Sequence, residues 1–193
     1  MKYVAFLRGI GLGKRRPQGA QLASTFKTIG HTEVATFIAS GNVIFSAKSR
    51  DPSALEKSAS EALEKQLGYQ VDVFVRTARD VVAIAASTPF PDEDPSAINL
   101  HVAFLSAEPS LEATKALVAV RTEYDRFRVM GRELYWLCRG PLSASKVWER
   151  PDVKSIRLPN STMRNITTLR RLTAKYLVLP CSSPAKAQRS STR

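Results

Sequence analysis

The chain has 193 residues, of which 44% are hydrophobic and 24% are charged, and its formal net charge is +12 at pH 7. This hydrophobic content excludes disorder over the whole chain and suffices for the core of one large domain or two small ones. No run approaches the roughly 18 apolar residues of a membrane-spanning helix, and the N-terminus has no signal-peptide cleavage site. Two cysteines form neither a disulfide framework nor a metal-ligand spacing, so we expect a cytoplasmic protein without membrane contact.

Apolar periodicity predicts both strands and helices in the first half of the chain. Strands are predicted over residues 2–9, 33–39, 43–47 and 70–77, and helices over residues 18–30 and 52–68. The second helix has clear end signals, because Asp51 suits the N-cap, Pro52 the first turn and Gly68 the C-cap. The order strand-helix-strand-strand-helix-strand is that of a ferredoxin-like unit.

The second half begins with a repeat, because Val102-Ala103-Phe104-Leu105 copies Val4-Ala5-Phe6-Leu7. The predicted elements after it are a helix over 109–120, strands over 123–129 and 133–138, a helix starting near Leu142, and a helix from Asn160 to about Leu177. The matching order of elements indicates that the second half resembles the first.

We therefore predict an α+β protein of two tandem ferredoxin-like units of the βαββα type, with antiparallel or mixed sheets and a C-terminal helix. The units cover residues 1–78 and 99–177. Residues 79–98 are predicted to connect them through a short helix and a stretch rich in proline and acids. Residues 178–193 are predicted to be a flexible basic tail.

Apolar residues occur on both faces of the first predicted sheet. In the strand 2–9, Val4 and Phe6 share one face, and Tyr3, Ala5 and Leu7 share the other. In the strand 70–77, Phe74 lies on the face opposite its valine neighbours. Because helices cover only one face of such a sheet, the other needs a cover from the second half, the C-terminal helix or a partner chain in a homodimer. A sheet buried on both faces is favoured over an open base-stacking platform.

Two glycine-containing loops are predicted to lie side by side. The first and third strands of a ferredoxin-like unit are antiparallel neighbours, so Arg8-Gly9 lies beside the turn Ser40-Gly41-Asn42. Glycines at 9, 11 and 13 let backbone amides approach an anion closely, and Lys14, Arg15 and Arg16 add positive charge. The alternative is that the glycines serve tight turns, with positive φ at Gly41 and Asn42.

A third segment, 160–165, is predicted to open the C-terminal helix, where free backbone amides attract anions. Arg164 and Asn165 are unusual in a first turn, because acids are favoured there. We predict that Arg164 shares one cleft with Arg8, Ser40 and Asn42. The alternative is that Arg164 pairs with a core or carboxyl partner in the other half.

The positive charge is unevenly distributed. Residues 154–193 contain nine Lys or Arg and no acid, whereas residues 51–125 contain six bases and thirteen acids. Within the basic end, Arg170, Arg171 and Lys175 form a basic helix face. An acid-free end favours a polyanionic partner, and the alternative is a solvated outer face of an amphipathic helix.

Four stretches in order carry a family resemblance: Arg8-Gly9-Ile10, Ser40 to Phe45, Thr88-Pro89-Phe90-Pro91 and Thr162-Met163-Arg164-Asn165. Over roughly residues 2–177 they resemble the signatures of the bacterial domain-of-unknown-function family 1697. The resemblance implies an α+β fold with ferredoxin-like units and no established activity. The chain departs from the family pattern at Gly11 and Lys14, where the family has Asn and Gly, and at Ile166, where it has Trp.

No catalytic group is identified by the sequence. His31 and His101 have no Ser, Cys or carboxylate at a motif spacing, and His101 and Cys138 are predicted to be packed rather than reactive. The adjacent acids 92–94 are typical of solvated side chains in a proline-rich stretch. We predict no metal site and no cofactor. Catalysis by a carboxylate pair stays open, because sequence spacing does not report spatial pairing.

Three hypotheses about function follow. The first is binding of nucleic acid, either RNA or single strands, which charge and fold analogy favour although the strands lack the aromatic pattern of an RRM. The second is an enzyme or sensor for a small anionic ligand, such as a phosphorylated one. Its polar lining would be Arg8, Ser40, Asn42, Arg164 and Asn165. The third is a scaffold or oligomer whose motifs are all structural.

Overall fold

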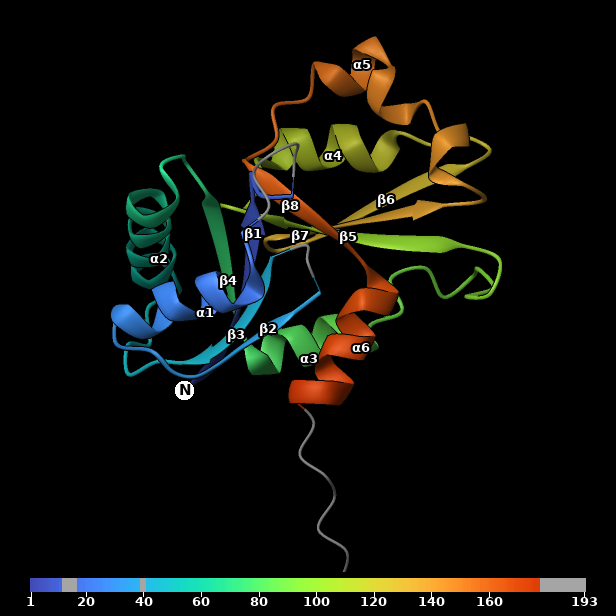
Figure 1. Ribbon diagram of the computed structural model, residues 1–193. Helices are drawn as coiled ribbons and strands as arrows, with labels where there is room; N and C mark the ends of the chain where they lie inside the picture. The colour runs from blue at the N-terminus through green and yellow to red at the C-terminus, as the bar shows by residue number, and fades with distance from the viewer. Residues whose placement is uncertain (12–16, 39–40, 178–193) are drawn as a thin grey trace, which may run out of the picture.

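The structure of the protein is a computed structural model that describes residues 1–11, 17–38 and 41–177 (Figure 1). Four of the predicted site residues, Lys14, Arg15, Arg16 and Ser40, lie outside the described residues. The predicted basic tail, 178–193, lies outside them as well.

The first half forms a four-stranded antiparallel sheet with the strand order β2-β3-β1-β4. Its elements are β1 (Lys2–Arg8), α1 (Gly19–Thr28), β2 (Thr32–Phe37), β3 (Asn42–Ser46), α2 (Pro52–Leu67), β4 (Asp72–Thr77) and α3 (Ala78–Ala86). The end signals of α2 are confirmed, because the Asp51 side chain accepts from the Ser53 amide and Gly68 ends the helix with a φ of 76°.

The second half forms a separate antiparallel sheet with the corresponding order β6-β7-β5-β8. Its elements are β5 (Asn99–Leu105), α4 (Leu111–Ala119), β6 (Asp125–Met130), β7 (Glu133–Cys138), the 3-10 helices η1 (Leu142–Ala144) and η2 (Val147–Glu149), α5 (Pro151–Lys154), β8 (Ser161–Asn165) and α6 (Ile166–Tyr176). The protein is therefore an α+β molecule with two four-stranded antiparallel sheets.

The prediction that a helix opens at residue 160 is wrong. Residues 161–165 form β8, which pairs with β5 from His101 opposite Asn165 to Leu105 opposite Ser161. The helix α6 begins only after Asn165, whose side chain caps it by accepting from the Thr167 amide. The edge of β5 offers backbone hydrogen bonds to these residues, and this pairing between distant segments outweighs their local helix signals.

The helix predicted near Leu142 is also replaced by shorter structure. The segment consists of η1, η2 and the four-residue α5. Pro141 and Pro151 stand at the starts of η1 and α5, where proline is tolerated, and Pro151 would interrupt a longer helix. Among the described helices, none combines the length and the apolar character needed to cross a membrane.

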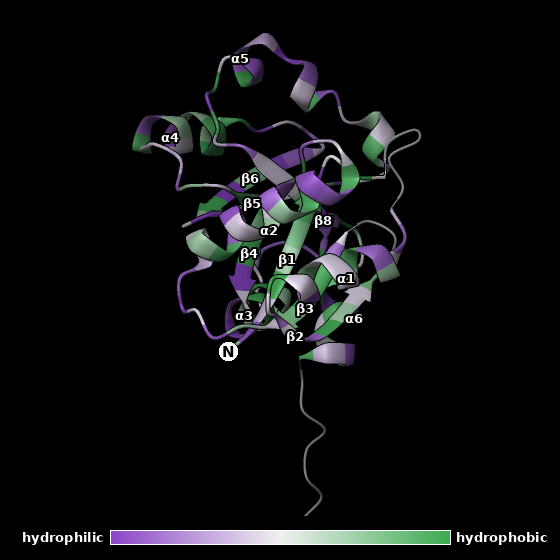
Figure 2. Cartoon of the chain, turned by 60° about the vertical axis from the view of Figure 1, so that its left-hand side comes forward, coloured by the Kyte–Doolittle hydropathy of each residue, from purple (hydrophilic) through white to green (hydrophobic). Residues whose placement is uncertain are grey.

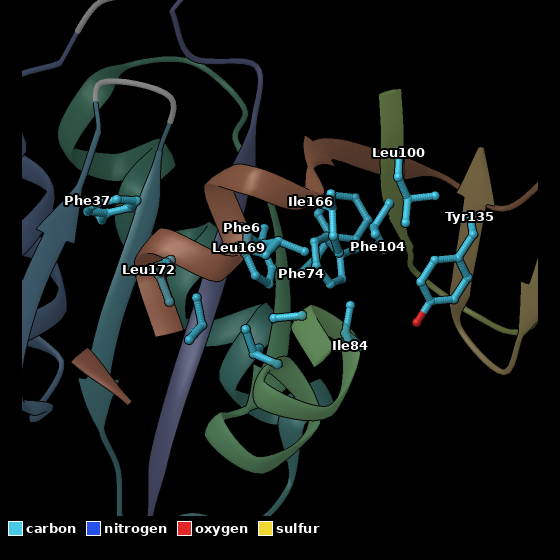
Figure 3. Packing of buried hydrophobic residues seen from close by; sticks show 14 of the residues in the cluster. Phe6, Phe37, Phe74, Ile84, Leu100, Phe104, Tyr135, Ile166, Leu169 and Leu172 are labelled. Carbon is cyan, nitrogen blue, oxygen red and sulfur yellow. The ribbon is translucent and has the colours of Figure 1, made fainter. Parts of the chain in front are cut away.

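The two sheets share a central core. It contains inner-face residues of both sheets together with α3 and α6, including Phe6, Phe74, Phe104, Ile84 and Leu169 (Figure 3). The helices α3 and α6 lie next to each other at one end of the sheets (Figure 1). The prediction that the apolar inner face of the first sheet is covered is confirmed, and the second half and α6 supply the cover.

Two further cores lie on the outer faces of the sheets. The first contains Tyr3, Ala5 and the valines of the β4 region, packed under α1 and α2. The second contains Leu134 and Trp136, packed with α4 and the η1–α5 segment. Accordingly, β1 is coloured hydrophobic along most of its length and lies in the interior of the molecule (Figure 2).

The acidic stretch before β5 is not simply solvated, in contrast to the expectation for residues 92–94. The Glu93 side chain is only 12% exposed and pairs with Arg126 and Arg139. These two guanidinium groups hold the pKa of the Glu93 carboxyl below its usual value, with Arg139 contributing most. The ion pairs join this stretch to β6 and to the end of β7. The sequence does not show these pairs, because their partners are more than 30 residues apart.

Candidate functional site

Arg164 lies at the interface between the two sheets and is almost fully buried. From β8 it reaches into the first half, where its Nε donates to Asn42 Oδ1 at 2.7 Å and its Nη2 donates to the carbonyl of Leu7 at 2.9 Å and that of Gly41 at 3.3 Å. Its Nη1 donates to Thr162 Oγ1 at 2.8 Å. We call this set of contacts the Arg164 clasp.

Arg76 makes the corresponding contacts in the opposite direction. From β4 it reaches into the second half, where its Nε donates to Glu133 Oε1 at 2.6 Å. Its Nη2 donates to the carbonyl of Leu105 at 3.0 Å and that of Arg132 at 3.2 Å. We call this set the Arg76 clasp. Sequence reasoning did not identify it.

The two clasps occupy equivalent positions in the two halves. Arg76 pairs with the first residue of the Val-Ala-Phe-Leu repeat in β1, and Arg164 pairs with the first residue of the repeat in β5. Each guanidinium carbon lies above a phenylalanine of the other half, at 5.5 Å from the centroid of Phe104 for Arg76 and 5.8 Å from that of Phe6 for Arg164. The interface is therefore built twice from the same parts.

A sequence signal for the second clasp does exist. Arg76-Thr77 and Arg164-Asn165 both end the fourth strand of their half, and Thr77 and Asn165 both cap the helix that follows. The signal is the arginine followed by a capping residue, because Arg76 lies ten residues further from its Val-Ala-Phe-Leu repeat than Arg164 does and an ungapped alignment on the repeat does not pair them.

The two clasps differ in the charge of the side chain that accepts from the arginine. In the Arg164 clasp the partner side chain is the neutral amide of Asn42, whereas in the Arg76 clasp it is the carboxylate of Glu133. Desolvation lowers the pKa of the Arg164 guanidinium to about 10. Desolvation also lowers the pKa of Arg76, and the hydrogen bond to Glu133 opposes this. Both groups tie the halves together through buried contacts.

Arg8 lies in a different environment from Arg164. It ends β1, is exposed, and its guanidinium donates to Asn160 Oδ1. Asn160 in turn donates to Asp72 Oδ2 at 2.9 Å, and both residues line a groove of about 210 Å³. Arg8, Asn160 and Asp72 form what we call the Arg8 corner. The structure thus brings Arg164 and Asn42 together and turns Arg8 toward solvent.

The predicted glycines occupy conformations that other residues rarely adopt. Gly9 has a φ of 88° and Gly41 a φ of 73°. A Cβ on Gly41 would lie 2.9 Å from Leu7 Cβ, so a side chain does not fit there. The Gly41 carbonyl accepts from both the Leu7 amide and Arg164. Asn42 is part of β3 and does not have positive φ.

The basic face of α6 is present and exposed. Arg170, Arg171 and Lys175 point outward, whereas Leu169 and Leu172 are buried in the central core. The helix contains no acidic residue. Arg170 is partly held by a hydrogen bond from its Nε to the Ala85 carbonyl at 3.2 Å. We call Arg170, Arg171 and Lys175 the α6 basic face.

Reactive side chains are sparse in the part of the chain that the structure describes. His101 is buried beside Trp136, and Cys138 is buried, which raises the pKa of its thiol. Within residues 1–11, 17–38 and 41–177, no three His, Cys, Asp or Glu side chains converge as metal ligands do. Polar side chains converge at the inter-sheet clasps, around a cavity beside the Arg76 clasp, at Glu93 and at Asp125.

Comparison with known families identifies the chain. The sequence profile of the family described as "Protein of unknown function (DUF1697)" matches residues 1–135. The chain belongs to this family. The matched region is shorter than the resemblance over 2–177 and ends before the fourth motif, Thr162–Asn165. No curated protein matches the chain.

A solved structure shares the DUF1697 protein's fold. It is described as the conserved bacterial protein SP0830 from Streptococcus pneumoniae, and it matches with a TM-score of 0.69 over 90% of this chain and 97% of that chain. The sequences are 16% identical. The likeness therefore concerns the arrangement of the elements and carries no activity with it.

Proposed function

We propose that this DUF1697 protein binds single-stranded nucleic acid, RNA foremost, through the α6 basic face. The observation that carries the proposal is that α6 exposes three cations and contains no acid. The sequence continues this character, because residues 154–193 include nine Lys or Arg and no Asp or Glu. Clustered cations of this kind release counterions from a phosphate backbone when they bind it.

The mode of binding follows from the burial of the sheets. Aromatic residues of β1 and β5, such as Phe6 and Phe104, are buried against each other and are closed to base stacking. We therefore expect contacts to phosphates rather than bases, with weak sequence preference and a steep dependence on salt.

The proposal is tested by fluorescence anisotropy of labelled RNA and single-stranded DNA at about 50 and about 200 mM salt. The variant Arg170→Gln/Arg171→Gln/Lys175→Gln should bind at least about 10-fold more weakly and show a salt slope shallower by up to about 2. The control Lys57→Gln/Lys65→Gln/Lys115→Gln removes the same charge from exposed positions on α2 and α4. Equal weakening by both variants would mean that net charge alone acts, and absence of binding would exclude the proposal.

We also infer that residues 1–78 and 99–177 are two ferredoxin-like domains related by duplication. Two observations support this inference: the strand orders β2-β3-β1-β4 and β6-β7-β5-β8 correspond, and the clasps lie at equivalent positions. The connection 79–98 contributes to packing, because α3 lies in the central core beside α6.

A second candidate function is recognition of a small anionic ligand, by an enzyme or a sensor, at the Arg8 corner. Its support is that Arg8 is exposed and that its guanidinium donates to Asn160, which lines the groove. Arg can bind a phosphate or carboxylate with two parallel hydrogen bonds. The test is a titration with inorganic phosphate and nucleoside monophosphates. Arg8→Ala should lose binding, whereas Arg50→Ala, an exposed control, should keep it. Binding that is absent, or equal in both variants, would leave Arg8 with a purely structural role.

A structural role is the interpretation that the contacts of Arg164, Asn42 and Gly41 favour. All three take part in one buried set of hydrogen bonds between the halves. A scaffold without a ligand would lose stability on substitution of these residues and would bind neither RNA nor phosphate.

A further inference from the structure

A cavity of about 470 Å³ lies beside the Arg76 clasp, between α3, the end of β4 and the turn from β6 to β7. This volume falls within the range of about 300–1,000 Å³ that small-molecule sites occupy. The cavity lies where the two halves meet, and α3, which lines it, packs against α6 on another side.

One part of the cavity wall is apolar. Ile84 of α3 and Tyr135 of β7 are both buried and line it, together with the more exposed Met130. The Tyr135 ring is 2% exposed, and burial raises the pKa of its hydroxyl. This wall is suited to the hydrocarbon or aromatic part of a ligand.

The cations of the cavity are already bound to protein carboxylates. Arg76 pairs with Glu133 at 2.6 Å, and Arg132 pairs with Glu56 at 2.9 Å. Neither guanidinium is therefore available to attract an anion without giving up a buried partner.

The carboxylates of the cavity exceed its cations. Asp80 and Glu108 line the cavity and form no ion pair with any residue that the structure describes. Glu108 Oε1 and Glu133 Oε2 lie 3.7 Å and 3.9 Å from where a Cβ on Gly131 would be. The cavity is therefore an acidic site in a chain whose net charge is +12.

Asp80 has a structural explanation of its own. It lies in the first turn of α3, where a carboxylate interacts favourably with the helix dipole. Glu108 lies in the loop before α4, is exposed to solvent, and forms no ion pair with a residue that the structure describes. Glu108 and the second oxygen of Glu133 are thus the groups with which a ligand would interact.

We propose that this cavity binds a small organic cation, an amine that carries an apolar group. The ammonium lies between Glu108 and Glu133, and the apolar group packs against Tyr135 and Ile84. The turn at Gly131 leaves room for the ammonium, because a side chain there would point at the two carboxylates.

The test is a titration of the full chain with phenethylamine. Binding is monitored by the chemical shifts of the Gly131 and Ile84 amides in NMR spectra. The matched anion 3-phenylpropionate has a similar ring and length and the opposite charge. We expect saturable shifts with the amine and binding of the anion at least about 10-fold weaker. Equal binding of both probes, or no shift at these amides up to about 10 mM amine, would overturn the proposal.

Two variants locate the site. Glu108→Gln should weaken amine binding at least about 5-fold, whereas Glu61→Gln, an exposed acid on α2, should leave it unchanged. Ala83→Trp fills the cavity from α3 without changing its charge and should abolish the shifts. Amine binding that survives both Glu108→Gln and Ala83→Trp would show that the amine binds elsewhere and would overturn the proposal.

Discussion

Phe6 and Phe104 stack on each other across the interface, with ring centroids 3.8 Å apart and planes inclined by 7°. Each is the third residue of its Val-Ala-Phe-Leu repeat, so the repeated sequence meets itself in space. The stack lies between the two clasps, because the Arg76 guanidinium lies over Phe104 and that of Arg164 lies over Phe6. This arrangement gives the phenylalanine of each repeat a role that its counterpart shares.

Phe6→Ala and Phe104→Ala should each lower the free energy of unfolding by about 3–5 kcal/mol, because each empties part of the central core. The double variant should lose less than the sum, with a coupling of about 0.5–1.5 kcal/mol from the aromatic pair. Urea unfolding of the four proteins measures this cycle. Strict additivity would show that the stack contributes nothing beyond burial.

Arg164→Ala should lower the free energy of unfolding by about 3 kcal/mol, because Asn42 and the Leu7 carbonyl would lose a buried donor. Arg164→Lys should not restore it, since an ammonium cannot reproduce the planar set of donors. Arg8→Ala is the control and should cost less than about 1 kcal/mol, because Arg8 is exposed. A fully stable Arg164→Ala protein would contradict a clasp that holds the halves together.

Asp125 is a buried carboxylate bound by neutral donors. It accepts from Trp136 Nε1 and Ser145 Oγ at 2.8 Å each, and from Thr122 Oγ1. Asp125→Ala should cost about 3 kcal/mol in thermal or urea unfolding, because three donors would lose their acceptor and one of them, Trp136 Nε1, is fully buried. Asp152→Ala, at an exposed pair with Arg150, should cost less than about 1 kcal/mol. Similar losses of stability in both variants would contradict the role of Asp125 as a buried hydrogen-bond acceptor.

The two histidines predict a pH dependence of stability. Burial lowers the pKa of His31 and of His101 below 6.5, and the Nε2 atom of each is buried without a hydrogen-bond partner among the described residues. As pH falls, the unfolded state takes up protons before the folded state does. The free energy of unfolding should therefore fall between about pH 7.5 and about pH 5.5, and level off below the folded-state pKa values.

The variant His31→Leu/His101→Leu should flatten this part of the pH profile. The measurement is urea unfolding at a series of pH values at constant ionic strength. Carboxylates such as Glu93, whose pKa is lowered, act at more acidic pH and should still destabilise the variant there. An unchanged slope above about pH 5.5 would exclude the histidines as its origin.

Features that depend on residues close together in the chain could be predicted from the amino acids alone. The limits of α2 follow from Asp51, Pro52 and Gly68, which act within one helical turn. Phe74 and the valines beside it point to opposite faces of the sheet, because side chains alternate along a strand. The structure places them in separate cores. The repeated letters of β1 and β5 indicated two similar halves.

Other features depend on partners that are far apart in the chain and meet only in the folded protein. Residues 161–165 form a strand because β5 offers them an edge, although their local signals favour a helix start. Arg164 is buried because its acceptors, Asn42 and the Leu7 carbonyl, come from 122 and 157 residues away. Hydrogen bonds and burial between remote segments leave no periodic trace in a single sequence, so the burial of the two clasps and the acidic cavity become visible only when the two sheets are packed together.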